Sequence, residues 1–259
     1  MPKSKIISKA LDADKPRLPL TLYLPELVRL KKAGIDFILV AGQAVNFWAN
    51  HFRKDQPLLE EFMPFVSKDV DLFGTYEDFY LIPKVLDGTL QRFKELFTPV
   101  MGVFTSRSEP SLMFELLRYV YGPVSTDKIR KRALIVGEIE VIDPVSLLIS
   151  KCHNAAGIEQ ENRQDIRHVK MMVLAVKCHY SGGTRVIGKR MTPRQFINEC
   201  KYLLDYADNH IFLSGLSMAD ATLSDCFPLA EIHTISTEHE SIGRFYSNTL
   251  IPTIEKLSL

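Results

Sequence analysis

The sequence predicts an α+β protein, with a mixed-sheet α/β domain in residues 20–145 followed by a helical domain in residues 146–259. Two observations support this division. Before Asp143, short β-prone segments alternate with helices of uneven length, which favours a mixed sheet over a doubly wound parallel one. After Asp143, most hydrophobic patterns have the 3.6-residue period of a helix.

The first predicted elements are a helix, a strand and a second helix. Residues 22–32 place apolar side chains at helical spacing and are followed by Gly34, a helix stop. Residues 37–40 are a fully apolar, β-favouring run that is bounded by Gly42. Residues 44–51 have helical character, so the sequence predicts a strand, a glycine turn and a helix in direct succession.

The rest of the α/β domain is predicted from its period and its turn residues. Residues 66–73 alternate apolar side chains with Asp69 and Asp71, so both carboxylates are expected on one face of a strand. A proline and a glycine divide the helical pattern of residues 78–97 into two short helices. Further expected elements are strands at 100–105, 111–117 and 133–141 and a helical connector at 126–132.

The predicted helical domain begins at a clear capping signal. Asp143 and Pro144 suit the N-cap and the first position of a helix that continues through Lys151. Further helices are expected at 165–179, 192–208 and 242–257, with loops at 181–188 and 214–217.

The composition is that of a globular protein, because 46% of the residues are hydrophobic and 24% are charged. No apolar run is long enough to span a bilayer and no signal peptide is visible, so a soluble cytoplasmic protein without a membrane partner is expected. The four cysteines are far apart and form no CxxC pair, which predicts reduced, mostly buried thiols rather than a zinc site or disulfides.

The net charge of +1 conceals an uneven distribution. Basic and acidic residues number 16 and 16 in residues 1–127, 13 and 6 in residues 128–194, and 3 and 9 in residues 195–259. The basic middle segment suits contact with the phosphates of RNA, and an internal charge match with the acidic end explains it equally well. The basic residues expected to flank an acceptor are Lys128, Arg130, Lys131, Arg132, Arg185, Lys189, Arg190 and Arg194.

One acidic pair stands out among five with i, i+2 spacing, although about four such pairs are expected by chance. Asp69 and Asp71 follow a buried strand whose end opens a helix, and a helix N-terminus can hold a phosphate. Carboxylates beside a phosphate are ligands for Mg²⁺. The third carboxylate expected nearby is Glu115, which lies in an otherwise apolar strand, and Glu140 is its competitor.

These motifs resemble the DNA polymerase β-like nucleotidyltransferase superfamily, through residues 40–45 (VAGQAV) and residues 67–72 (SKDVDL). Within it, the chain is most similar to the AbiEii/AbiGii-toxin-like branch over residues 25–175. Further matches to that branch are residues 114–117 with Gly122, residues 142–151 and residues 163–166. The chain departs from the family at Gln43, where the family usually has glycine or serine.

The resemblance implies a nucleotidyltransferase domain that moves a nucleoside monophosphate from an NTP to an RNA or protein acceptor and releases pyrophosphate. It also implies two Mg²⁺ ions and, for a toxin, an antitoxin protein as partner. The implied metal ligands are Asp69, Asp71 and Glu115; the implied nucleotide-binding residues are Gly42, Gln43, Ser67 and Lys151; and Lys151 and Asp165 complete the catalytic set. The competing hypothesis is an inactive binding protein on the same scaffold.

Two of these residues also have ordinary structural interpretations. Lys151 either contacts phosphates or is a helix-surface lysine. Arg163 and Asp165 either form an ion pair at the site or begin a helix, where aspartate is favoured in any case.

Overall fold

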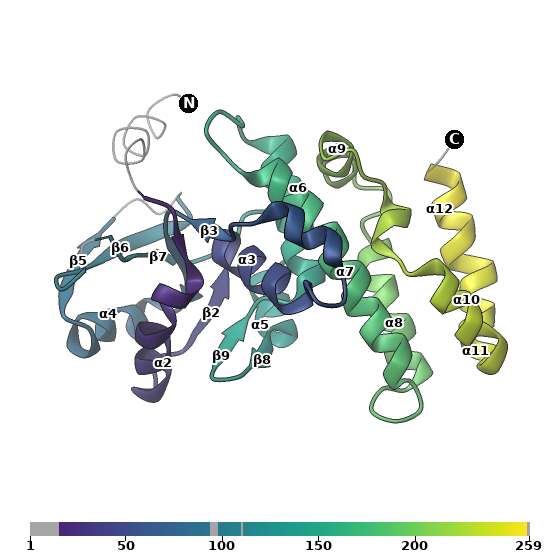
Figure 1. Cartoon of the computed structure of the whole chain (residues 1–259), viewed down its shortest axis with the longest axis horizontal. Helices are drawn as coiled ribbons and strands as arrows, with labels where there is room; N and C mark the ends of the chain where they lie inside the picture. Colours follow the sequence, from purple (N-terminus) through teal and green to yellow (C-terminus); the bar gives the residue numbers. More distant parts are fainter. Residues whose placement is uncertain (1–15, 94–97, 110, 258–259) are drawn as a thin grey trace. The chain divides into compact units, whose positions relative to one another are not determined.

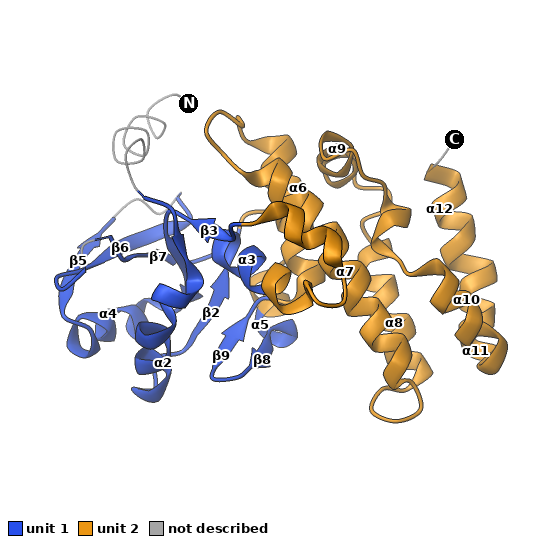
Figure 2. Cartoon of the chain, viewed as in Figure 1, with its two compact units in different colours: residues 1–47, 64–120, 130–142 blue, residues 48–63, 121–129, 143–259 orange. Residues whose placement is uncertain are grey.

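The computed structural model describes residues 16–93, 98–109 and 111–257. The chain divides into two compact units, shown in Figure 2. Unit 1 takes its described residues from 1–47, 64–120 and 130–142, and unit 2 from 48–63, 121–129 and 143–257. The last segment of unit 2 thus begins close to the predicted start of the helical domain, while residues 48–63 and 121–129, predicted within the α/β domain, belong to unit 2.

Unit 1 is built on a mixed sheet whose described strands lie in the order β5-β6-β7-β4-β2-β9-β8 (Figure 1). Their bounds are β2 (Phe37–Val40), β4 (Val70–Gly74), β5 (Gly88–Arg92), β6 (Val100–Ser106), β7 (Met113–Leu117), β8 (Leu134–Val136) and β9 (Ile139–Val141). The β4–β7 and β2–β9 pairs are parallel and the other pairs are antiparallel. The predicted mixed sheet is confirmed.

Short elements and helices complete unit 1. A separate antiparallel pair consists of β1 (Leu18–Pro19) and β3 (Val66–Ser67), and the helical elements are η1 (Leu20–Leu22), α2 (Leu24–Lys32) and α4 (Tyr76–Val85). Two helices, α3 (Ala41–Phe52) and α5 (Thr126–Arg132), each have residues in both units. All four residues of β2 are buried, as expected for an apolar strand in the interior of a sheet.

Unit 2 is helical, which confirms the predicted helical C-terminal region. Its elements are η2 (Pro57–Phe62), α6 (Pro144–Gly157), α7 (Asp165–Val186), α8 (Pro193–Leu204), α9 (His210–Met218), η3 (Leu223–Cys226), α10 (Leu229–Glu238), α11 (Glu240–Phe245), the π-helical η4 (Tyr246–Leu250) and α12 (Ile251–Leu257). Asp143 caps α6 as predicted, because its Oδ1 accepts hydrogen bonds from the backbone N–H groups of Val145 at 3.2 Å and Ser146 at 3.1 Å. Helix α6 packs against α7 and α9 and is buried through Ala155.

Three local predictions are wrong, and packing explains two of them. Residues 88–92 form strand β5 instead of a second short helix; a Cβ at Gly88 would lie 2.3 Å from the Thr105 carbonyl oxygen, so glycine allows the close pairing with β6. Residues 214–217 lie within α9, where Gly215 packs directly on the backbone of Cys152 in α6. The loop expected at 181–188 begins only after Val186, because α7 runs through Gly182 and Gly183.

Two features of the structure, the state of the cysteines and the character of the helices, bear on expectations drawn from the composition. All four cysteines are free and buried, and burial raises the pKa of each thiol. Within the described ranges, no helix has the length and apolar character needed to cross a membrane.

Candidate active site

The sheet of unit 1 brings two of the predicted metal ligands opposite each other. Strands β4 and β7 run parallel, and Asp71 is the register partner of Glu115. Register partners on neighbouring strands project to the same face, and such strands lie about 4.8 Å apart. Both residues are partly buried. Glu140, the competing third carboxylate, is instead paired with Ile135 in the β8–β9 hairpin, where Lys31 Nζ lies 3.4 Å from its Oε2.

Asp69 lies just outside the strand that was predicted to contain it. Residues 66–73 are interrupted, so that β3 ends at Ser67, β4 begins at Val70, and Asp69 occupies the bend between them. The expectation that Asp69 and Asp71 alternate within one strand is therefore wrong. The three carboxylates still belong to one region, because Asp69 directly precedes β4 and Asp71 is its second residue.

A buried tyrosine marks the same end of β4 and β7. The Tyr23 side chain is fully buried, and its ring meets Phe114 edge-on at 5.6 Å between centroids. Phe114 is in turn the register partner of Val70, the residue after Asp69. Burial and then the Asp69 carboxylate raise the pKa of Tyr23 to about 12, against a smaller lowering by the Met113 backbone. Tyr23 therefore keeps its proton at neutral pH.

The strand-to-helix corner lies beside Asp71. Val40, the last residue of β2, is the register partner of Asp71, and α3 begins at the next residue. Ala41 has a left-handed backbone, with φ of 52°. The predicted turn residue Gly42 already lies inside the helix, so the corner occurs one residue earlier than the sequence predicts.

Two of the predicted nucleotide-binding residues of unit 1, Gln43 and Ser67, lie beside Leu18. The Gln43 side chain is fully buried, and its Nε2 donates a hydrogen bond to the Leu18 carbonyl at 2.9 Å. Ser67 is the register partner of Leu18 in the β1–β3 pair. Asn46 donates to the Gln43 Oε1 at 3.2 Å. The Gln43 amide is therefore engaged by the protein itself, and the groups at this corner that a phosphate could contact are the backbone N–H groups at the start of α3.

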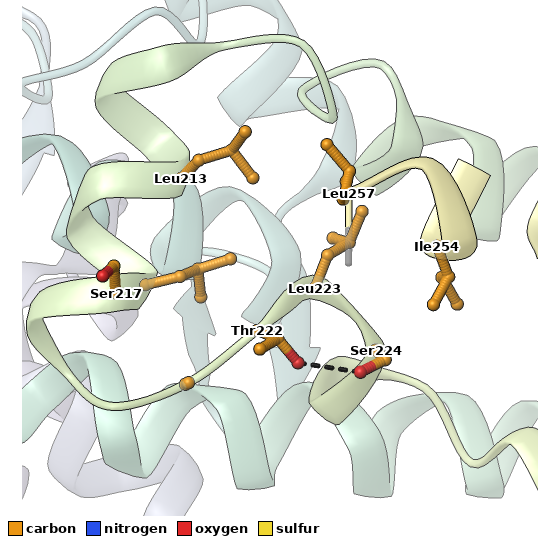
Figure 3. A pocket seen from close by; sticks show the side chains of 9 residues that line it. Leu213, Ser217, Thr222, Leu223, Ser224, Ile254 and Leu257 are labelled. Atoms are coloured by element: carbon orange, nitrogen blue, oxygen red, sulfur yellow. Dashed lines mark hydrogen bonds between the residues drawn. The ribbon is translucent and has the colours of Figure 1, made fainter. Parts of the chain in front are cut away.

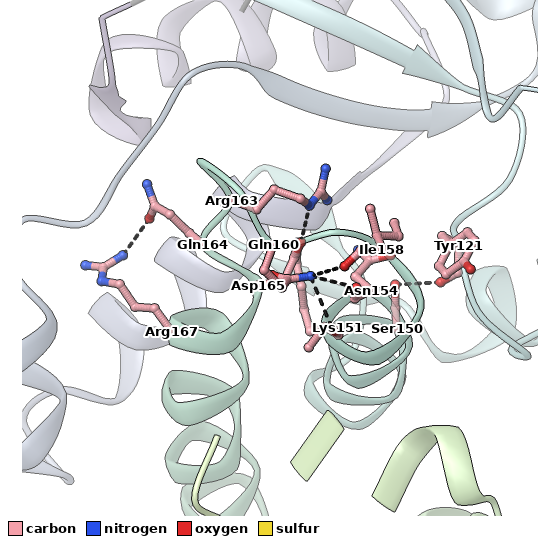
Figure 4. Close-up of polar contacts among 11 residues, drawn as sticks. Tyr121, Ser150, Lys151, Asn154, Ile158, Gln160, Arg163, Gln164, Asp165 and Arg167 are labelled. Carbon is pink, nitrogen blue, oxygen red and sulfur yellow. Dashed lines mark hydrogen bonds and ion pairs between the residues drawn. The ribbon is translucent and has the colours of Figure 1, made fainter. Parts of the chain in front are cut away.

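The remaining two predicted residues form a buried ion pair within unit 2 (Figure 4). Lys151 Nζ lies 3.0 Å from Asp165 Oδ1, and the two side chains are only 5% and 3% exposed. Arg163 Nε lies 2.6 Å from the other carboxylate oxygen. The interpretation of Lys151 as a surface lysine is wrong, whereas Arg163 and Asp165 satisfy both interpretations, since Asp165 is also the first residue of α7.

The charges around Asp165 decide its protonation. Burial alone would raise the pKa of this carboxyl group, but the charges of Lys151 and Arg163, together with their hydrogen bonds, lower the pKa to about 2. Polar contacts fix the surrounding backbone as well. Gln160 Nε2 donates to the carbonyls of Asn154, Ala155 and Ile158 at the end of α6, and Ser150 Oγ donates to the Tyr121 carbonyl at 2.7 Å.

Two further observations delimit the site. Among the residues that the structure describes, no group of three or more His, Cys, Asp or Glu side chains is gathered closely enough to hold a metal ion. A cavity of about 220 Å³ lies in unit 2 between α9, η3 and the C-terminal helix (Figure 3). Its lining is largely aliphatic, with Leu213, Leu216, Leu223 and Ile254, and it contains none of the predicted site residues.

Comparison with known proteins adds little. No model of a known protein family matches the sequence, and no curated protein matches it. A solved structure, the crystal structure of JHP933 from Helicobacter pylori, is similar with a TM-score of 0.34 and 9% identity, over 86% of this chain and 94% of that one. A likeness at this TM-score carries no argument about fold or function.

Proposed function

We propose that this protein is a Mg²⁺-dependent nucleotidyltransferase that transfers a nucleoside monophosphate from an NTP to an RNA or protein acceptor. The register of β4 and β7 is the observation that carries this proposal. It sets Asp71 opposite Glu115, with Asp69 two residues before Asp71 and the start of α3 beside them. Carboxylates that face one another across neighbouring strands offer hard oxygen ligands from two directions to one bound cation.

The chemistry of the donor set suits magnesium, although the three carboxylates are not gathered closely enough in the described structure to hold a metal ion by themselves. Asp69, Asp71 and Glu115 offer the hard carboxylate oxygens that Mg²⁺ prefers. Proteins usually hold Mg²⁺ through one or two carboxylates, while substrate phosphates and water complete the octahedron. Two ions held here together with the triphosphate would supply charge stabilisation at the reacting phosphorus and at the departing pyrophosphate.

The residues of unit 1 have separate roles in the proposed reaction. An acceptor oxygen attacks the α-phosphorus, a P–O bond forms, and the bond to the β-phosphate oxygen breaks to release pyrophosphate. A Glu115 carboxylate oxygen takes the proton from the acceptor. Backbone N–H groups from Gly42 onward, in the first turn of α3, hold phosphate oxygens. The nucleotide-contacting role assigned to Lys151 and the catalytic role assigned to Asp165 stay predictions, as does the antitoxin partner.

An inactive nucleotide-binding protein on the same scaffold is the second candidate. The burial of Gln43 favours it, because this side chain is not exposed to a ligand and is already bonded to Leu18 and Asn46. The two candidates differ in turnover but share NTP binding. Thermal unfolding with and without millimolar NTP and Mg²⁺ reports that shared property, since a ligand bound only to the native state raises the midpoint.

Asp71→Asn tests the transferase. This substitution keeps the shape of the side chain and removes one charge from the proposed metal site. Consumption of NTP in the presence of Mg²⁺ should fall by a factor on the order of 10² to 10³, the loss that follows removal of one transition-state contact. Incubation with labelled NTPs, total RNA and candidate proteins would identify the acceptor.

Asp87→Asn is the matched control, because Asp87 is an exposed aspartate of unit 1 that pairs with Arg107 at 3.1 Å, outside the site. The control should retain full activity. Unchanged turnover in a folded Asp71→Asn variant would end the assignment. A wild-type protein whose unfolding midpoint rises with NTP but which consumes none would establish the binding protein instead.

A further inference from the structure

The connection between α7 and α8 is a fixed turn. The Val186 carbonyl at the end of α7 accepts hydrogen bonds from the N–H groups of Lys189 at 3.1 Å, Arg190 at 2.9 Å and Met191 at 3.2 Å. Gly188, with φ of 78°, adopts the left-handed conformation that this turn needs. Thr192 and Gln195 close the start of α8 with a capping box. The turn therefore presents its side chains from a preformed backbone.

Four cations lie on this turn and the adjoining helix ends: Arg185, Lys189, Arg190 and Arg194. All four are exposed, and residues 185–194 contain no acidic residue. We call residues 185–194 the basic turn. None of its four cations forms an ion pair with another described residue.

Among the described residues, no ion pair joins the acidic end of the chain to the four cations of the basic turn. Asp208 pairs with Lys256 at 3.1 Å, and Asp220 pairs with Lys170 at 2.9 Å. Glu231 accepts hydrogen bonds from Ser181 and Thr184, which lie five and two residues before the end of α7. The interpretation of the basic segment as an internal charge match thus finds no ion pair at these four residues.

Helix stability does not explain the position of Arg194 either. Arg194 is the second residue of α8, and a cation in the first turn of a helix opposes the positive end of the helix dipole. Arg185, in contrast, lies in the last turn of α7, where a cation is favourable. Within the basic turn, Lys189, Arg190 and Arg194 are therefore the three cations that neither an ion pair with a described residue nor the helix dipole accounts for.

The surface chemistry of the basic turn favours a nucleic acid backbone over a protein as the binding partner. Specific protein interfaces have an apolar core, often with aromatic residues. The large hydrophobic side chains that are exposed elsewhere in the described chain, such as Ile135 and Met218, have no counterpart in the basic turn. Binding of a nucleic acid backbone requires only cations that displace counterions from phosphates, and arginine contacts phosphate in a bidentate manner.

We propose that the basic turn binds the phosphodiester backbone of a single-stranded nucleic acid. The contact is electrostatic and independent of sequence, and the rigid turn fixes where the strand crosses the end of the α7–α8 hairpin. The inference does not depend on the transferase reaction, because it concerns unit 2 residues alone and needs neither NTP nor Mg²⁺.

The test compares two triple variants of the full chain by fluorescence anisotropy with labelled, unstructured RNA and DNA oligonucleotides. In K189Q/R190Q/R194Q the three unpaired cations are neutralised. In the control, K32Q/K170Q/K256Q, the same charge is removed from three lysines that are ion-paired with Glu138, Asp220 and Asp208. Titrations without NTP and Mg²⁺, over a range of salt concentrations, give the slope of log K against log salt.

Wild type and control should bind both oligonucleotides with a steep salt dependence. The basic-turn variant should bind about tenfold or more weakly at low salt, with a slope shallower by up to about 2, from about 0.7 per phosphate on single strands. Its melting temperature should be unchanged or higher, because Arg194 no longer opposes the helix dipole. Absence of salt-dependent binding by wild type, or equal losses in both variants, would overturn the proposal.

Discussion

Replacing Asp165 by asparagine tests the buried charges of unit 2. The wild-type carboxylate has a pKa of about 2 instead of its usual 3.8. Because one pKa unit corresponds to about 1.4 kcal/mol, the ionised form contributes on the order of 2 kcal/mol to folding at neutral pH. Asparagine removes that contribution and leaves Lys151 buried without its charge partner, a change that typically costs about 3–5 kcal/mol. We expect Asp165→Asn to lower the free energy of unfolding by about 3 kcal/mol.

The pH dependence follows from the direction of the pKa shift. A carboxyl group whose pKa is lowered in the folded state stabilises the protein above its unfolded pKa, and the stabilisation is lost as the pH falls through the folded value. The difference between wild type and Asp165→Asn should therefore be constant from neutral pH to about 5 and shrink between 3.8 and about 2. Urea denaturation at a series of pH values, followed by circular dichroism, measures this difference.

The control variant is Asp220→Asn, which breaks an exposed pair. Asp220 lies 2.9 Å from Lys170, but its side chain is 87% exposed, so its loss should cost less than about 1 kcal/mol. If Asp165→Asn costs no more than Asp220→Asn, the buried pair does not stabilise unit 2 and the electrostatic reasoning is refuted.

Two further predictions concern packing. Tyr23→Phe should leave the free energy of unfolding unchanged or raise it by up to about 1 kcal/mol, because the buried Tyr23 hydroxyl has no partner at full hydrogen-bond geometry and the Met113 backbone acts on it only weakly. A loss above about 1.5 kcal/mol would show that the Met113 backbone is a full hydrogen-bond partner. Gly182→Ala should stabilise α7 by about 0.5–1 kcal/mol, because a Cβ at this position meets open space. Gly215→Ala should instead lower the free energy of unfolding by at least about 1–3 kcal/mol, because its Cβ would lie 2.3 Å from the Cys152 carbonyl oxygen. Thermal unfolding of both variants checks the second prediction, and equal midpoints would contradict it.

Elements whose signals are local in the sequence were predictable. The start of α6 depends on Asp143 and Pro144 alone, and the start of α8 on Thr192 and its capping partner Gln195. Elements that depend on distant contacts were not. Strand β5 exists because it pairs with β6, and a segment of five residues is too short for its period to separate strand from helix.

Glycine was the most misleading residue for the same reason. In sequence, Gly182, Gly183 and Gly215 suggest loops, because glycine disfavours helices. In the structure all three lie within helices, and Gly215 allows α9 to approach the α6 backbone closely. A glycine that allows close helix packing and a glycine that forms a turn look the same in the sequence. Only the tertiary contact distinguishes these two roles.

The candidate site also has features that are local in the sequence and features that depend on distant contacts. Residue types and spacing singled out Asp69 and Asp71 as candidates and left Glu115 and Glu140 in competition as the third carboxylate, because carboxylates are unusual in apolar strands. The choice of Glu115 over Glu140 as the residue opposite Asp71 required the strand register, which depends on which segments pair across more than forty residues of sequence. Likewise, the burial of Lys151 followed from the packing of α6 and was invisible in its helical pattern.

The position of the strand-to-helix corner at Ala41 was not predicted from the sequence. A left-handed alanine costs about 1–2 kcal/mol, so sequence reasoning assigns the turn to the neighbouring Gly42. The alanine keeps this conformation because both sides fix it: β2 is buried throughout, and α3 is anchored by the hydrogen bond from Gln43 to Leu18. A strained backbone maintained in this way is typical of sites that need a fixed geometry. The same contacts that engage Gln43 therefore hold the start of α3 next to Asp71, where the proposed reaction needs backbone N–H groups.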